Sequence, residues 1–184
     1  MYSILRRRRY LGGIRRYLSE ETSEILVHAF ISSKLDKCNS LLYGLPKHLL
    51  NGLRSIQNTA ARIVTLSKRF DHITPIMFKL HWLRLSYRIH FKILLLVYKC
   101  LNGLAPIYLS ELLRYSISPR LLRSSSQNFL AVPRSRSKTY GDNAFSVVAP
   151  KLWNQLPPEL RGATSVDQFR KHLKTYLFKL AYDV

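Results

Sequence analysis

The chain has 184 residues, and its 30 lysines and arginines against 10 aspartates and glutamates give a formal net charge of +20. Hydrophobic residues make up 47% and charged residues 22%, which is the range of folded globular proteins and excludes a wholly disordered chain. A charge of this size repels itself unless a polyanion offsets it, so the composition favours RNA, DNA or an anionic membrane surface as partner. The alternative is an ordinary basic protein whose charges are merely solvated.

A membrane anchor is not expected. The most apolar run, residues 91–101, contains Lys92 and Lys99 and is about half as long as the ~20 residues that a membrane span needs. It predicts a buried helix instead. Residues 1–18 are rich in arginine and free of acids, as in a mitochondrial presequence, but they lack the long apolar stretch of a secretion signal. Because the arginine pattern continues along the chain, we do not predict a targeting segment.

The first predicted helix begins after Ser19, whose hydroxyl can cap it, and acidic residues follow where the helix dipole is positive. It reaches about Leu35, and its predicted apolar face is Ile25, Leu26, Ala29, Phe30 and Ile31. The second predicted helix starts near Pro46, a residue suited to a first turn. Its predicted apolar face is Leu49, Leu50, Leu53, Ile56, Ala60, Ile63 and Val64, and its polar face is Arg54, Gln57, Asn58 and Arg62.

Three further helices are predicted before residue 114. Thr74-Pro75, a cap followed by proline, predicts a short helix to about Leu80. A longer and more apolar helix begins at Ser86 and is closed by Asn102-Gly103. Pro106 then opens a brief helix to about Leu113.

The amino-acid composition changes at Arg114, after which serine, proline, arginine and glutamine predominate. Residues 129–132 are the only candidate strand. Beyond Tyr140, residues 142–156 predict a helix broken at Pro150, and Pro157-Pro158 predicts an extended turn. A capping-box pattern at Ser165 opens the last helix, whose predicted apolar face is Val166, Phe169, Leu173, Tyr176, Leu177 and Leu180.

These elements predict a mainly α, multi-helix bundle with at most one or two short strands. We divide the chain into a basic N-terminal segment (1–18), a helical domain (19–113), a Ser/Arg-rich loop segment (114–140) and a C-terminal helical segment (141–184).

No catalytic residue is predicted. Polymerase and nuclease centres need carboxylates close together to hold metal ions, whereas the acids here are scattered and form no DD or DxD pair. The histidines lack HxxxH and HExxH spacing, and Gly12-Gly13 is not part of a phosphate-binding loop. Cys38 and Cys100 have no CxxC spacing and are predicted to be reduced core residues. We therefore predict no metal, no cofactor and no small-molecule substrate.

The cationic residues form three blocks. The first is Arg6, Arg7, Arg8, Arg9, Arg15 and Arg16, with Tyr10 and Tyr17 interleaved. The second is Arg120, Arg123, Arg134, Arg136 and Lys138, beside Phe129 and Tyr140. The third, Arg170, Lys171, Lys174 and Lys179, lies on the last helix and is interpreted as a solvated face. Arginine matches phosphate oxygens and aromatic rings stack on bases, so the first two blocks, with Tyr140, are the predicted nucleic-acid-binding residues. The first block is also compatible with a localisation signal or with the arbitrary edge of a larger protein.

A series of short strings resembles one known family. LDKCNSLLYGLP at residues 35–46 resembles the LDYCNSLLYGLP string that follows the polymerase domain of LINE-type, non-LTR retrotransposon reverse transcriptases, particularly the Jockey-like group. The same order continues with IQNTAAR (56–62), DHITP (71–75), LHWL (80–83), FKILLL (91–96), LNGLAP (101–106), YLSELL (108–113), VPRSR (132–136), YGD (140–142), AFS (144–146) and APKLWN (149–154). The resemblance extends from about residue 14 onward.

The resemblance implies a thumb-like and C-terminal region that helps to hold template RNA and target DNA during target-primed reverse transcription, beside upstream polymerase domains. The F/YxDD motif and the endonuclease have no counterpart in this sequence, so no catalytic residue is carried over. Lys37, where an aromatic residue is usual, and Arg84, where proline is common, depart from the family. A start within the region is expected of a degenerate insertion or a partial gene model.

The first functional hypothesis is therefore a non-catalytic fragment of a retrotransposon reverse transcriptase that binds RNA, DNA or both, in the nucleus or the cytoplasm. The alternative is a host-adopted helical module that binds a protein through its apolar helix faces. A small enzyme would require a fold that brings the scattered acids or histidines together in one cleft.

Overall fold

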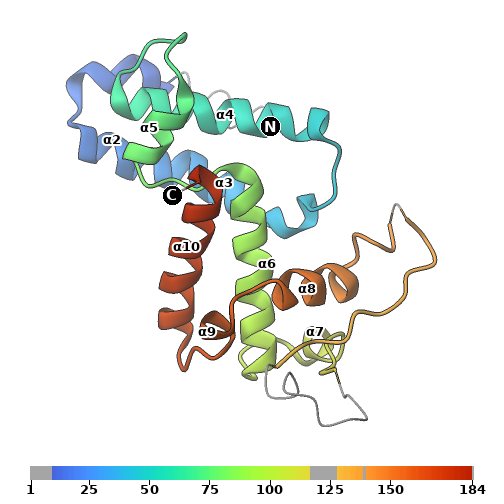
Figure 1. The fold of residues 1–184 in the computed structure, drawn as a ribbon. Helices are drawn as coiled ribbons and strands as arrows, with labels where there is room; N and C mark the ends of the chain where they lie inside the picture. The colour runs from blue at the N-terminus through green and yellow to red at the C-terminus, as the bar shows by residue number, and fades with distance from the viewer. Residues whose placement is uncertain (1–9, 117–127, 139, 184) are drawn as a thin grey trace. The chain divides into compact units, whose positions relative to one another are not determined.

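The structure, a computed structural model, describes residues 10–116, 128–138 and 140–183 (Figure 1). It confirms the predicted mainly α fold, and the residues described contain no β-sheet. The α-helices are α2 (Glu20–Val27), α3 (Ser33–Asp36), α4 (Lys47–Thr65), α5 (Ile73–Lys79), α6 (Leu85–Leu101), α7 (Ile107–Ser110), α8 (Phe145–Asn154), α9 (Pro158–Arg161) and α10 (Val166–Tyr182). None of the helices described is long and apolar enough to cross a membrane.

The chain divides into two compact units, and the division differs from the predicted segments. Unit 1 contains the described residues up to Ile89 together with those from Leu177 onward, and unit 2 is His90–Tyr176. The boundaries fall inside α6 and α10, so each of these helices contributes residues to both units.

The first helical stretch of unit 1 starts as predicted but buries a different face. The Ser19 hydroxyl accepts a hydrogen bond from the backbone N–H of Thr22, which caps α2. A π-helical turn, His28–Ser32, then separates α2 from α3. This wider turn rotates the following residues relative to a regular α-helix, and the buried apolar residues are Val27, Ile31 and Leu35. The predicted face is wrong at Ile25 and Phe30, which are exposed, and at Ala29.

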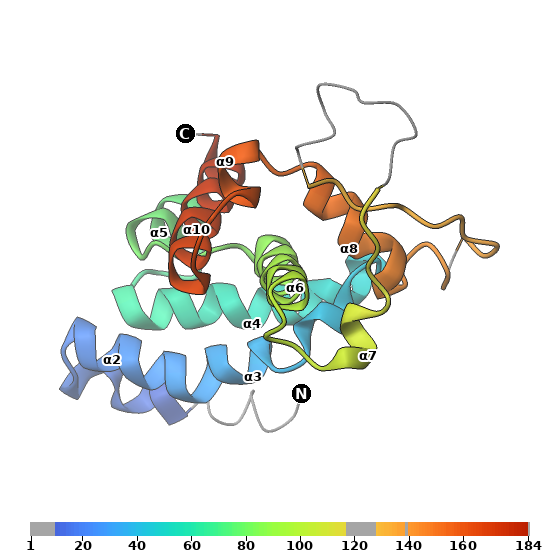
Figure 2. The same cartoon turned by 90° about the horizontal axis from the view of Figure 1, so that it is seen from below.

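Helix α4 packs along α2 and α5 and supplies the centre of the unit 1 core (Figure 2). Its buried apolar residues, Ile56, Ala60, Ala61 and Val64, only partly match the predicted face, because Leu49 is exposed. Gln57, predicted on the polar face, is buried, and its amide nitrogen donates to the carbonyl of Leu83 at 2.7 Å. That bond satisfies a polar side chain inside the core. The core cluster is Leu11, Val27, Ile31, Leu35, Ile56, Ala60, Ala61, Val64, Met77 and Trp82.

Polar and aromatic contacts complete unit 1. Arg88 forms a two-point ion pair with Asp36, with Nε to Oδ1 at 2.9 Å and the terminal nitrogen to Oδ2 at 2.5 Å. The Tyr182 hydroxyl donates to the carbonyl of Trp82 at 2.6 Å. The end of α10 is therefore anchored to the segment between α5 and α6.

Cys38 is exposed with a backbone φ of 55°, so the prediction of a core residue is wrong there.

Aromatic rings form the centre of unit 2. Phe169 of α10 is fully buried, its ring stacks on Tyr98 of α6 at 4.3 Å between centroids, and Trp153 of α8 lies 5.9 Å away. The predicted break of α8 at Pro150 is wrong, because the helix continues through this proline to Asn154. Proline costs α8 one backbone hydrogen bond, and burial of residues on both sides of Pro150 offsets that loss.

The predicted strand at residues 129–132 forms only an isolated antiparallel bridge between Leu130 and Tyr115. On its other side, Leu130 pairs with the side chain of Asn154. Asn154 accepts from the backbone N–H of Leu130 at 2.9 Å and donates to its carbonyl at 2.8 Å. A side-chain amide thus takes the place of a neighbouring strand.

The remaining helix limits are close to prediction. Gly103 has a φ of 69° and follows the end of α6, and Pro106 precedes α7, which ends at Ser110 rather than Leu113. Pro157 is extended and Pro158 opens the short helix α9. The Ser165 hydroxyl accepts from the backbone N–H of Gln168 at 3.2 Å, which confirms the predicted start of α10.

Candidate nucleic-acid interface

The predicted binding residues are distributed over both units. Arg6, Arg7, Arg8, Arg9, Arg120 and Arg123 lie outside the described residues. Arg16 is exposed in unit 1, and Arg134, Arg136, Lys138 and Tyr140 are exposed in unit 2. The four exposed residues of unit 2 therefore lie close together in sequence, between residues 134 and 140, whereas Arg16 belongs to unit 1.

Serine hydroxyls hold the segment that carries Arg134, Arg136 and Lys138. The Ser135 hydroxyl donates to the carbonyl of Ser137 at 2.8 Å, and the backbone N–H of Asp142 donates to the same carbonyl at 3.0 Å. A Cβ atom on Gly141 would lie 2.1 Å from the Ser135 hydroxyl oxygen and 2.8 Å from the Ser137 carbonyl oxygen, so only glycine fits. This turn leaves the three cationic side chains exposed.

Arg15 is the exception among the predicted residues, because it is only 6% exposed. Its Nε donates to the carbonyl of Ile63 at 2.8 Å, and its terminal nitrogens donate to the carbonyls of Val64 at 2.7 Å and Leu18 at 2.6 Å. The last carbonyls of an α-helix have no partner within the helix and carry partial negative charge. Arg15 therefore caps the C-terminal end of α4, and its assignment as a surface contact for nucleic acid is corrected.

Replacing Arg15 with alanine is expected to lower the free energy of unfolding of unit 1 by about 2 to 3 kcal/mol, because hydrogen bonds from a charged donor are lost and buried carbonyls remain unpaired. Urea denaturation followed by circular dichroism measures this change. Arg16→Ala is the matched control, since Arg16 is exposed, and it should leave stability nearly unchanged. Unaltered stability of the Arg15 variant would contradict the capping role.

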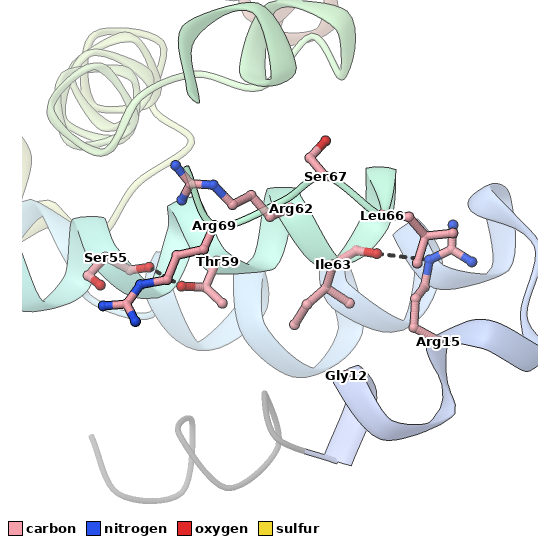
Figure 3. A pocket seen from close by; sticks show the side chains of 9 residues that line it. All are labelled: Gly12, Arg15, Ser55, Thr59, Arg62, Ile63, Leu66, Ser67 and Arg69. Carbon is pink, nitrogen blue, oxygen red and sulfur yellow. Dashed lines mark hydrogen bonds between the residues drawn. The ribbon is translucent and has the colours of Figure 1, made fainter. Parts of the chain in front are cut away.

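A cationic hollow lies beside α4 in unit 1 (Figure 3). It has a volume of about 730 Å³ and is lined by Gly12, Arg15, Ser55, Thr59, Arg62, Ile63, Leu66, Ser67 and Arg69. We refer to this set as the cationic hollow. None of its lining residues is acidic, and three of them carry hydroxyl groups. In Figure 3 the side chains of Arg62 and Arg69 extend toward the Ser55 end, whereas Arg15 lies against α4 at the other end.

Arg62 and Arg69 are the cations that remain available in the hollow. Arg62 donates from a terminal nitrogen to the carbonyl of Asp71 at 3.1 Å, while its shielded Nε has no hydrogen-bond partner among the described residues. Arg69 is exposed, and no carboxylate of the described residues lies within salt-bridge distance of either guanidinium. Two guanidinium groups with neighbouring hydroxyls present the planar donors that phosphate oxygens accept.

A second hollow, of about 330 Å³, lies on the neighbouring side of α4. Its lining includes Arg54, Asn58, Thr74 and Arg84, and Arg84 donates to the Thr74 hydroxyl at 3.3 Å. The cationic character of this part of unit 1 therefore extends beyond the cationic hollow.

Arg54 and Arg62 lie on the predicted polar face of α4, but neither they nor Arg69 are among the predicted binding residues. The sequence feature that could have indicated them is an arginine on the last turns of an amphipathic helix, followed after the helix end by Lys68-Arg69.

Arg161 is a different case, because it is buried in unit 2 with its guanidinium 4.2 Å from the centre of the Phe129 ring. Because Arg161 is buried it is not part of the cationic surface, and the same burial lowers its pKa from the ordinary value.

The described residues contain no group of three or more histidine, cysteine, aspartate or glutamate side chains that could hold a metal ion. No family model, no curated protein and no solved structure matches the chain.

Proposed function

We propose that this protein binds nucleic acid through backbone phosphates, without catalysing a reaction on it. The observation that carries the proposal is the cationic hollow, where Arg62 and Arg69 lie among hydroxyl-bearing residues and no acidic residue lines the cavity. The net charge of +20 supports it, since a polyanion offsets the repulsion between like charges. Exposed Arg134, Arg136 and Lys138 supply a second set of phosphate contacts in unit 2.

The resemblance to the region downstream of the polymerase in LINE-type reverse transcriptases is consistent with this function. A thumb-like and C-terminal region holds template and target strands while another domain carries out the chemistry. We propose that the chain is a fragment of such an enzyme and retains only the holding function, with RNA, DNA or both as ligand. In the parent protein the polymerase domains would be its partner.

The double variant R62Q/R69Q tests the proposed function at the cationic hollow. Each phosphate contact adds about one unit to the slope of log affinity against log salt concentration, so removing two should reduce that slope by about two. At low salt the affinity should fall about tenfold or more. Fluorescence anisotropy with a labelled oligonucleotide at several potassium chloride concentrations gives both quantities.

The matched control for this experiment is K171Q/K174Q, which removes the same charge from two exposed lysines on α10 within unit 2. Its salt slope should stay close to that of the unmodified protein if these lysines are a solvated face. Equal slopes for R62Q/R69Q and the unmodified protein would remove the cationic hollow from the interface. Circular dichroism of both variants checks that the helices are retained.

A host-adopted protein-binding module is the second candidate, and one observation favours it. Leu104, which precedes α7, is 59% exposed, and Ile107 and Tyr108 in its first turn are 76% and 67% exposed. Neighbouring apolar side chains of this kind are typical of contact surfaces between proteins. A protein partner that stays bound after nuclease treatment and is lost in an Ile107→Asp variant would support this function instead.

A further inference from the structure

The turn that joins α4 to α5 presents Arg69 and Phe70 side by side. Residues 68–71 form a four-residue turn in which the backbone N–H of Asp71 donates to the carbonyl of Lys68 at 3.2 Å. The Asp71 carboxylate accepts from the backbone N–H of Lys68 at 2.6 Å, which closes the same turn from the other side. Arg69 and Phe70 are the two central residues of this hydrogen-bonded turn, and both side chains are exposed.

The turn lies against the cationic hollow. Arg62, which lines the hollow, donates to the carbonyl of Asp71 at 3.1 Å, and Arg69 of the turn lines the hollow itself. The one carboxylate of the turn, that of Asp71, is held by the backbone of Lys68. Phe70 is thus attached to a hydrogen-bonded turn whose other exposed side chains are the cations Lys68 and Arg69 and the carboxylate of Asp71, which the Lys68 backbone N–H already engages.

Phe70 is 93% exposed, more than any other large hydrophobic side chain in the part of the chain that the structure describes. A phenyl ring in water gains free energy when a flat apolar surface covers it. The cations around Phe70 favour an anionic molecule as the source of that surface. A nucleic-acid strand carries both groups in each nucleotide, a phosphate for arginine and a base for the ring.

We propose that Phe70 is a stacking platform for an unpaired base, so that the cationic hollow takes single-stranded rather than double-stranded nucleic acid. Arg62 and Arg69 hold a phosphate and Phe70 covers the face of an adjoining base. In a duplex each base already stacks on its neighbours and its face is not available, whereas a single strand offers it at little cost. This inference rests on the proposed function, because it assigns the ligand class of the same site.

The test compares three probes that separate base from phosphate: an oligothymidine strand of about 12 nucleotides, an abasic strand of the same length, and a duplex of that length. The abasic strand keeps every phosphate and has no base to stack. The variants are F70A, which removes the ring, and F70W, which keeps a stacking surface. Y108A serves as the matched control, since Tyr108 is an exposed aromatic residue of unit 2.

F70A is expected to weaken binding of oligothymidine by about fivefold or more, because stacking of a base on an aromatic ring contributes about 1 to 3 kcal/mol. Its affinity for the abasic strand and the duplex should not change. F70W should bind oligothymidine at least as tightly as the unmodified protein, and Y108A should bind all three probes normally. Since Phe70 is almost fully exposed, the thermal unfolding of F70A should also be unaltered.

Two results would overturn the inference while leaving the proposed function intact. One is an F70A variant that binds oligothymidine normally, as expected if a protein rather than a base covers the ring. The other is an equal loss for all three probes, which would indicate a general effect on the turn. If the unmodified protein binds none of the probes at low salt, the proposed function fails, and the inference fails with it.

Discussion

Raising the salt concentration from 50 to 200 mM is expected to weaken the binding of a nucleic-acid strand by about 10³-fold, which is the loss found when about six phosphates are engaged. Six cations of the proposed interface could each neutralise one phosphate: exposed Arg16 and Arg69 and half-buried Arg62 in unit 1, and exposed Arg134, Arg136 and Lys138 in unit 2. Binding to these cations releases counterions from the strand, and added salt opposes that release. Anisotropy titrations with a strand of about 30 nucleotides, long enough to engage the cations of both units, measure the effect.

The slope of log affinity against log salt concentration distinguishes a phosphate-binding surface from other modes of association. An apolar contact such as the one considered for Ile107 and Tyr108 depends only weakly on salt or strengthens as salt is added. An R134Q/R136Q/K138Q variant should lower the slope by about three, in proportion to the contacts removed. Binding that is independent of salt concentration, or absent at 50 mM, would contradict the proposed function.

Replacing Phe169 with alanine is expected to lower the free energy of unfolding of unit 2 by about 3 to 5 kcal/mol. The side chain is fully buried and lies between the rings of Tyr98, at 4.3 Å, and Trp153, at 5.9 Å. Its removal leaves a cavity that these rings fill only in part, and the transfer free energy of the ring is lost as well. Urea denaturation followed by circular dichroism measures the change.

Phe70→Ala is the matched control for Phe169→Ala, because the same ring is removed from a position that is 93% exposed. Its effect on the free energy of unfolding should stay within about 0.5 kcal/mol. A loss below about 1 kcal/mol for Phe169→Ala would mean that α10 is not packed on α6 and α8 through this ring.

The helix starts at Ser19 and Ser165 were predictable because their signals are local, whereas Thr74, predicted to cap a helix, lies inside α5, which begins at Ile73. Ser19 and Ser165 each accept a hydrogen bond from a backbone N–H three residues further on, and nothing else in the fold is needed for that contact. The buried faces were less predictable. In the first helical stretch the buried residues of α2 are Ser23 and Val27 rather than Ile25, and beyond them a π-helical turn at residues 28–32, which no periodic pattern in the sequence marks, changes the helical period.

Long-range contacts explain the remaining differences. Gln57 has the character of a surface residue until the carbonyl of Leu83, 26 residues away, is brought to it. Likewise, Arg15 shares a basic block with Arg16, and only the fold places the carbonyls of Ile63 and Val64 against its guanidinium. Composition therefore predicted a cationic surface, whereas the choice between Arg15 and the pair Arg62 and Arg69 depends on tertiary structure.

The pairing between Asn154 and Leu130 restricts which amino acid can occupy position 154. The side chain must donate with one atom and accept with the other, at the reach of two carbon atoms from the backbone. Aspartate has the same shape but would place an oxygen against the Leu130 carbonyl, leucine offers neither group, and glutamine is one carbon longer. The position thus carries a chemical specification that hydrophobicity does not express.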